Sequence, residues 1–302
     1  MNSISSSRSV AIIGLVLTSL FWSGNIFISK ILIDIVPPFT LNMIRWLIAI
    51  LVLSPFALPS LVRLWPIIKR SWLQLSVYGF LGVTVYNAFL YNAAYTTDGL
   101  NIAVISTVTP LFTFIFAWMF FGDKPSVHQM VGFVFGICGV LLLISQGSLS
   151  VFQQLAFNNG DIWMLSASLA WAVYTAYLVK KPQGLPSIVF MFATTVLGIL
   201  MALPSVVWEF SQGHIIAQFN QTVILSLVYI GIFPSVCSYL FFNHGVSVLG
   251  SQTASLCAYL IPVFTAIIGI LFLQESIHWY HVVSQILVFV GFYLALMKSK
   301  SR

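Results

Sequence analysis

A series of long apolar runs constrains the fold of this chain more than any other feature. A helix needs about 20 residues to cross roughly 30 Å of hydrocarbon. The runs are apolar throughout, whereas the strands of a membrane barrel alternate apolar and polar residues. We therefore expect an all-α polytopic membrane protein with ten transmembrane helices, over residues 10–31, 41–59, 73–95, 101–121, 126–144, 161–179, 187–208, 222–243, 252–273 and 279–297.

The composition excludes a water-soluble fold. Of the 302 residues, 60% are hydrophobic and 6% are charged, whereas soluble proteins carry about 25% charged residues. The net charge of +6 comes from few groups and forms no basic stripe, so we expect a lipid bilayer and no nucleic acid as the partner. The three cysteines lie inside apolar runs and show no disulfide or zinc spacing.

The basic residues indicate how the chain crosses the bilayer. If the N-terminus is cytoplasmic, ten of the 12 Lys and Arg residues lie at cytoplasmic positions. Such a bias follows the positive-inside rule. We therefore expect an even number of spans, with both termini in the cytoplasm.

The sequence also repeats itself in order. Short similar segments recur 145 to 152 residues apart, pairing 19–22 with 168–171, 57–60 with 202–205 and 110–113 with 262–265. Duplication in so apolar a chain is typical of transporters built from two repeats. We divide the chain into a first five-helix repeat, 1–145, and a second, 160–302. Because five is odd, the second repeat enters the membrane from the opposite side, and the repeats are inverted.

Several motifs resemble the EamA-type domain of the drug/metabolite transporter superfamily. In the first half the similar residues are Leu20-Phe21-Trp22-Ser23-Gly24-Asn25, Lys30, Pro37-Pro38, Arg45, Pro110, Phe121-Gly122-Asp123, Gly132, Gly136 and Gly139, and in the second half Pro262, Glu275 and Gly291. The resemblance covers nearly the whole chain. It implies a ten-helix inner-membrane carrier, in a family of which many members export amino acids or other metabolites.

The chain departs from the family pattern at three points. The second half has no counterpart to Lys30 or Arg45, and Asp123 stands where the family usually has Glu. These departures leave the substrate and the coupling of transport open.

A pair of polar residues in the third span recurs in the eighth. Asn87 and Tyr91 are four residues apart and share one helix face. An offset of 152 turns them into Tyr239 and Asn243, the same pair in swapped order. Inverted repeats would bring the two faces together near the midplane, where they would line a substrate cavity. The alternative is that these side chains only bridge helices by hydrogen bonds.

Two further sets of residues are candidates for the same cavity. Trp22 with Asn25, and Trp171 with Tyr174, are three residues apart near the middle of the first and sixth spans. Trp and Tyr offer large amphipathic surfaces to a metabolite. The alternative for the tryptophans is an interfacial aromatic belt.

Other residues of the spans are candidates for substrate contact or for bending. Arg45 either faces an anionic substrate group or joins a Lys30–Asp34 pair at the outer end of the first span. Tyr259 precedes Pro262, and polar residues precede Pro110. A proline inside a span frees backbone carbonyls, so Pro110 and Pro262 are either gating hinges or static packing features.

The sequence lacks the motifs of an ATP-driven pump or an enzyme. It has no phosphate-binding loop, no catalytic dyad and no His-Glu-x-x-His helix. Glu275, His278 and His281 have a spacing that metal ligands can use, but a solvated outer loop explains them better. We expect no enzyme, cofactor or metal.

The function that best fits these features is a secondary transporter of small metabolites. We expect an exporter of amino acids or related amphipathic compounds, working by alternating access at a central cavity. A facilitator or exchanger of other metabolites or drugs, or a membrane sensor that does not translocate, fits the sequence as well. A monomer and a homodimer are both compatible with it.

Overall fold

The computed structural model describes residues 2–32, 35–97, 99–154, 158–214, 216, 220–273 and 278–297. Every regular element in this part of the chain is a helix. The first half contains α1 (Asn2–Leu32), α2 (Pro38–Arg70), α3 (Trp72–Gly79), η1 (Phe80–Val85), α4 (Tyr86–Thr96), α5 (Gly99–Ser106), α6 (Thr109–Phe121) and α7 (Val127–Ile144).

A short 3-10 helix, η2 (Leu149–Gln154), precedes the second half. The second half contains α8 (Asn159–Tyr177), η3 (Leu178–Lys180), α9 (Ser187–Ser211), α10 (Gln221–Ile230), η4 (Gly231–Cys237), α11 (Ser238–Leu249), α12 (Ser251–Ser255), η5 (Leu256–Tyr259), α13 (Leu260–Leu273) and α14 (Trp279–Leu296).

These elements join into spans that confirm the expected number. Among the described residues, ten helical segments are long and apolar enough to cross a membrane. The second span is longer than the expected 41–59, because α2 continues through Pro55, Pro59 and Pro66 to Arg70. Proline removes one backbone hydrogen bond and bends a helix, but packing on neighbouring helices keeps it continuous.

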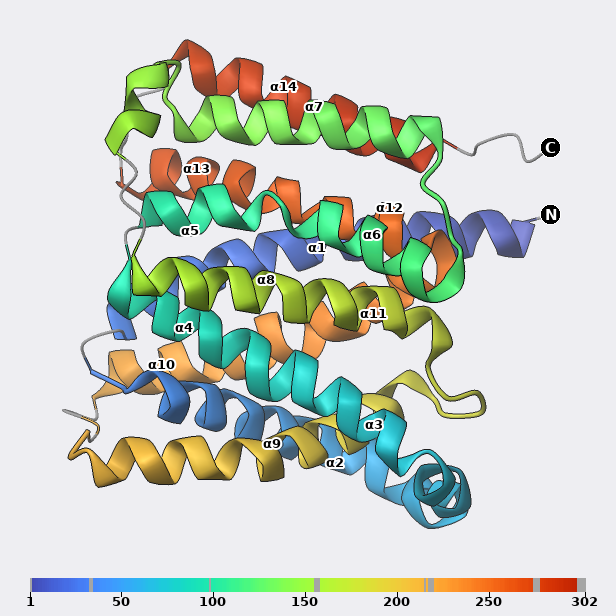
Figure 1. Cartoon of the computed structure of the whole chain (residues 1–302). Coiled ribbons are helices and arrows are strands. Elements are labelled where there is room, and N and C mark those ends of the chain that lie inside the picture. The colour runs from blue at the N-terminus through green and yellow to red at the C-terminus, as the bar shows by residue number, and fades with distance from the viewer. Residues whose placement is uncertain are drawn as a thin grey trace.

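The packing of the helices relates the two halves to each other. Helix α1 packs on α11 and α13, and its counterpart α8 packs on α4 and α6. Helix α2 contacts η4, while α9 contacts η1; α2 also packs on α9, and α7 on α14. Exchanging the halves therefore reproduces the same set of contacts. Figure 1 shows α7 and α14 along one edge of the bundle and α2 and α9 along the other.

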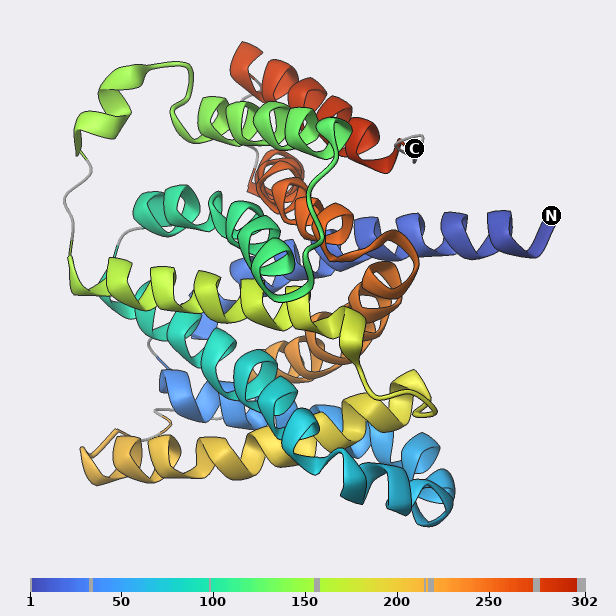
Figure 2. The same cartoon turned by 45° about the vertical axis from the view of Figure 1, so that its right-hand side comes forward.

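Small residues allow the closest of these approaches. A Cβ atom on Gly132 of α7 would collide with the backbone carbonyl of Gly291 on α14, and one on Gly139 with that of Ser284. The Gly132/Gly136 motif of the fifth span thus packs within the chain. The start of α1 and the end of α14 lie on one side of the bundle (Figures 1 and 2), where Arg8 donates a hydrogen bond to the Leu296 carbonyl.

Candidate substrate site

The two predicted Asn/Tyr faces meet in the middle of the bundle. Asn87 Nδ2 of α4 donates to the Tyr239 hydroxyl of α11 at 3.1 Å. That hydroxyl in turn donates to the Gly82 carbonyl at 2.6 Å. Asn87 and Tyr239 are both buried. Since they are 152 residues apart, equivalent residues of the two halves contact each other, as expected next to a two-fold axis.

Each half also contributes a tyrosine that donates a hydrogen bond to an asparagine, and the two bonds correspond to each other. The Tyr91 hydroxyl donates to Asn25 Oδ1 at 3.4 Å, and the Tyr174 hydroxyl donates to Asn243 Oδ1 at 2.9 Å. The second bond is the first with Asn and Tyr exchanged between the halves. The structure therefore brings together all the Asn and Tyr residues that the sequence pairs by their offsets.

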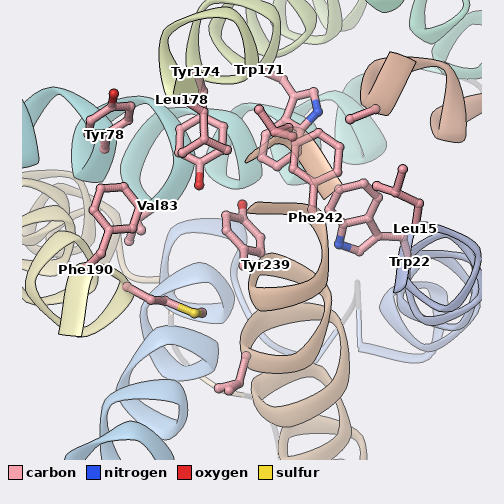
Figure 3. Close-up of a cluster of buried hydrophobic side chains, with 14 of the residues drawn as sticks. Leu15, Trp22, Tyr78, Val83, Trp171, Tyr174, Leu178, Phe190, Tyr239 and Phe242 are labelled. Carbon is pink, nitrogen blue, oxygen red and sulfur yellow. The ribbon is translucent and has the colours of Figure 1, made fainter. Parts of the chain in front are cut away.

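Aromatic rings pack against these hydrogen-bonded Asn and Tyr side chains. Trp22 and Trp171 lie with ring centroids 5.2 Å apart and nearly perpendicular. Trp171 stacks on Tyr174 at 5.0 Å and meets Tyr239 edge-on at 5.5 Å. Figure 3 shows these rings, with Phe242, converging from α1, α8 and α11.

The other tryptophans near the ends of spans lie in a different environment. Both Trp22 and Trp171 are buried, whereas the side chains of Trp65, Trp72, Trp208 and Trp279 are more than half exposed. An interfacial aromatic belt therefore describes those four residues and not the central pair.

Arg45 is buried beside these residues and is held by neutral oxygens. Its guanidinium donates from Nε to Ser235 Oγ at 2.8 Å, and from Nη1 to Asn87 Oδ1 at 2.7 Å and to the Tyr91 hydroxyl at 2.8 Å. The side chain is 1% exposed, and the Trp46 ring lies 5.2 Å from its guanidinium carbon. Arginine stays protonated in proteins, so a full positive charge lies here among neutral side chains.

Two π-helices shape the backbone around the site. The elements η1 and η4 lie at equivalent places of the third and eighth spans and end two residues before Asn87 and Tyr239. In a π-helix turn, a side chain can donate a hydrogen bond to the backbone carbonyl five residues before it. Asn87 Nδ2 donates to the Gly82 carbonyl at 3.2 Å, and Ser235 Oγ to the Ile230 carbonyl at 2.8 Å. Such π-bulges are frequent at functional sites.

The two predicted hinge prolines follow breaks in their spans. Pro110 lies in the first turn of α6, after the chain leaves α5 at Ser106, and Pro262 lies in the first turn of α13, after η5. Tyr259 lies at this break rather than in the central cluster. Its hydroxyl donates to the Thr107 carbonyl at 2.9 Å, which satisfies a backbone group at the break of the fourth span.

A small cavity of about 10 Å³ adjoins the site on the α9 side. The Tyr174 and Tyr239 rings and the Asn243 side chain line it, facing Thr194 and Thr195 of α9. This volume is roughly that of one water molecule. The predicted binding residues are thus packed closely, with little open space between them.

The sequence did not single out two buried carboxylates. Glu209 accepts hydrogen bonds from the backbone amides of Phe39 and Thr40 at 2.9 and 2.7 Å. Asp161 accepts from Asn101 Nδ2 at 2.9 Å and from the Thr97 hydroxyl at 2.7 Å. Both residues fall near the ends of apolar runs, and nothing in their local sequence separates a buried carboxylate there from a solvated one.

The remaining sequence candidates are described only in part. Asp34, Glu275 and the Lys30 side chain lie outside the described part of the chain. His281 Nδ1 accepts a hydrogen bond from the His278 amide at 3.0 Å. Across the described residues, no group of three or more His, Cys, Asp or Glu side chains is placed to hold a metal ion.

Known proteins are similar to this chain in sequence and in fold. The model of the EamA-like transporter family matches twice, at residues 9–145 and 158–297. A solved crystal structure superposes with a TM-score of 0.74 over 96% of both chains, at 16% identity. An uncharacterized transporter of Archaeoglobus fulgidus is 27% identical over 94% of this chain and 96% of its own length.

Two further relatives are the uncharacterized inner membrane transporter YedA of Escherichia coli and a WAT1-related chloroplastic protein of Arabidopsis thaliana. The first is 28% identical over 78% of this chain and 81% of its own length. The second is 24% identical over 91% of this chain and 66% of its own length. With both halves matched, the chain belongs to the EamA-like transporter family, and it is a multi-pass membrane transporter.

Proposed function

We propose that this protein is a secondary transporter of small amphipathic metabolites, namely amino acids or related carboxylates, in the inner (plasma) membrane. One observation carries the proposal: the buried Arg45 guanidinium has only neutral hydrogen-bond partners among the described residues and lies beside a cluster of aromatic rings. The surroundings of Arg45 therefore select for a ligand that brings a negative charge.

A carboxylate complements this arrangement energetically. An isolated buried charge is costly, and a hydrogen-bonded partner of opposite charge offsets that cost. A carboxylate can also accept two parallel hydrogen bonds from one guanidinium. The rings of Trp22, Trp171 and Tyr174 offer a surface for the apolar part of the same molecule. Carboxylates with an aliphatic or aromatic body fit both features.

The repeats support alternating access as the mechanism. Corresponding helices of the two halves make corresponding contacts, and each half supplies five of the spans found in the described residues. Inverted repeats of this kind rock around a site at their interface. In this scheme Asn25, Asn87, Tyr91, Tyr239 and Asn243 contact the substrate, while the breaks before Pro110 and Pro262 act as hinges.

Flux into sealed vesicles tests the proposal. Purified protein in proteoliposomes should take up radiolabelled hydrophobic amino acids with saturable kinetics and without ATP. Arg45→Gln should lower uptake at least tenfold, because one charge-assisted hydrogen bond contributes about 1.5–3 kcal/mol. Arg63→Gln is the matched control: Arg63 lies on the same helix but is exposed, and uptake should not change.

The flux outcomes separate the alternatives. Uptake that follows a proton gradient indicates antiport, and uptake indifferent to that gradient indicates a facilitator or exchanger. Binding of amino acids without any flux would overturn the transporter and indicate a sensor. Normal uptake by Arg45→Gln would remove Arg45 from the site.

A further inference from the structure

The structure sets which residues of α2 and α9 are equivalent. The two helices begin at Pro38 and Ser187, 149 residues apart. Gly79 and Gly231 occupy equivalent places, and a Cβ atom on them would contact the backbone carbonyls of Thr194 and Arg45 respectively. Thr194 therefore stands in α9 where Arg45 stands in α2. The identical segments 57–60 and 202–205, which are 145 apart, lie one helical turn off this register.

This equivalence relates the surroundings of Arg45 to the cavity. The residues equivalent to Arg45 and its neighbours all line the cavity: Thr194 for Arg45, Tyr239 for Asn87, Asn243 for Tyr91, Tyr174 for Asn25 and Val83 for Ser235. The cavity is thus the counterpart of the space that the Arg45 guanidinium fills. The first half places a cation in its space, and the second half has a cavity at the equivalent place.

The cavity has the chemistry of a cation site. The residues that line it include Tyr174, Tyr239 and Asn243, whose side chains bear hydroxyls and an amide, and none of its lining residues in the described part of the chain is charged. Tyrosine rings attract cations through their faces, as the ring of Tyr91 does 6.0 Å from the guanidinium carbon of Arg45. Thr195 adds a buried hydroxyl that has no hydrogen-bond partner among the described residues. Such an oxygen is expected to pair when a ligand enters.

We propose that this cavity is a subsite for the primary ammonium group of the substrate. A volume of about 10 Å³ suits a group the size of water, which an ammonium is. The Asn87–Tyr239 hydrogen bond connects a partner of Arg45 to a residue of the cavity wall. A zwitterion therefore places its carboxylate at Arg45 and its ammonium in the cavity. This inference rests on the proposed function and narrows its substrates to compounds with a free amine.

The subsite can be tested by binding, without transport. The apparent melting temperature of the purified full-length protein is measured in methylammonium or ethylammonium chloride against sodium chloride at equal ionic strength. Alkylammonium should raise it by mass action. Thr195→Val should weaken this stabilisation about tenfold. It should not lower the melting temperature of the unliganded protein, because the hydroxyl has no partner there.

A matched control is available in the same molecule. Thr175 is also fully buried, and its hydroxyl has no hydrogen-bond partner within the described ranges, but it does not line the cavity. Thr175→Val should leave the alkylammonium effect unchanged. Should Thr195→Val fail to fold, Asn243→Leu removes an acceptor of the same cavity and should also weaken the effect.

The outcomes separate this inference from the proposed function. Equal melting temperatures in alkylammonium and sodium, or an undiminished alkylammonium effect in Thr195→Val and Asn243→Leu, would overturn the ammonium subsite. Binding of 3-phenylpropionate, a carboxylate without an amine, tests Arg45 alone. If that binding is present and depends on Arg45 while the alkylammonium effect is absent, the proposed function stands and the subsite does not.

Discussion

At the scale of single residues, Arg45 shows how a membrane protein stabilises a buried charge. Its partners are the oxygens of Ser235, Asn87 and Tyr91, which are dipoles rather than charges. Dipoles offset part of the desolvation cost of a cation, and they can be displaced by a stronger acceptor. A site of this kind is stable when empty and still attracts an anion.

Replacing one of these dipoles with a charge tests that account. Asn87→Asp puts a carboxylate of nearly the same shape 2.7 Å from Arg45 Nη1. The change also removes the Nδ2 donor to Tyr239 and Gly82. We therefore expect Asn87→Asp to lower the apparent melting temperature less than an acid introduced away from Arg45, because the new pair with Arg45 offsets the lost bonds. We expect the affinity for carboxylates to fall at least tenfold. Thermal shift and equilibrium binding of 3-phenylpropionate measure the two effects.

The control lies on the same helix. Asn92 is half-buried and donates only to the Ala88 carbonyl, so Asn92→Asp places an acid where no guanidinium receives it and should lower the melting temperature. If Asn87→Asp is destabilised to the same extent, the charge of Arg45 is already neutralised and the anion site is wrong.

At the scale of elements, the start of α2 depends on another helix. Helix α2 begins after Pro37 and has no capping side chain of its own. The carboxylate of Glu209, near the end of α9, accepts from the first amides of α2 and from the Thr40 hydroxyl. A negative charge at a helix N-terminus also interacts favourably with the helix dipole. The ends of the second and seventh spans are thereby held together at one side of the bundle.

We expect this cap to be measurable. Glu209→Gln keeps the size of the side chain but removes its charge, and it should cost about 1–3 kcal/mol of stability, seen as a lower apparent melting temperature of the purified protein. Asp123→Asn, which changes an exposed carboxylate at the other side of the bundle, is the control and should have little effect. Equal melting temperatures for wild type and Glu209→Gln would show that this end of α2 does not depend on the charge.

At the scale of the whole molecule, ten spans return the chain to the side where it started. Arg8 contacts the Leu296 carbonyl, which places the first and last helices together at that side (Figure 1). The exposed loop around Ser148 lies at the opposite side. The bias of basic residues predicts that the side of the termini faces the cytoplasm.

Reporter fusions check this orientation. A fluorescent protein fused to either terminus should fold and fluoresce, and alkaline phosphatase at either terminus should be inactive, because it requires the oxidising exterior. Phosphatase inserted at Ser148 should be active. Phosphatase activity at one terminus only would require an odd number of spans.

The sequence by itself determined the number of helices, the family and the pairing of Asn87/Tyr91 with Tyr239/Asn243. The mean hydropathy of about 20 residues identifies a span whether its faces contact lipid or other helices. Polar residues are easily recognised in an apolar chain. The sequence left the C-terminal end of α2 and the burial of Glu209 open, since apolar residues look alike on lipid-facing and buried faces.

Only the tertiary structure decided the register between α2 and α9. Identical letters at 57–60 and 202–205 suggested an offset of 145, while the contacts of Gly79 and Gly231 give 149. A helix presents a similar apolar surface when it is moved by one turn, so sequence similarity does not settle the register, but close backbone contacts do. With the offset of 149, Thr194 is the counterpart of Arg45, and the cavity is the counterpart of the space around the Arg45 guanidinium.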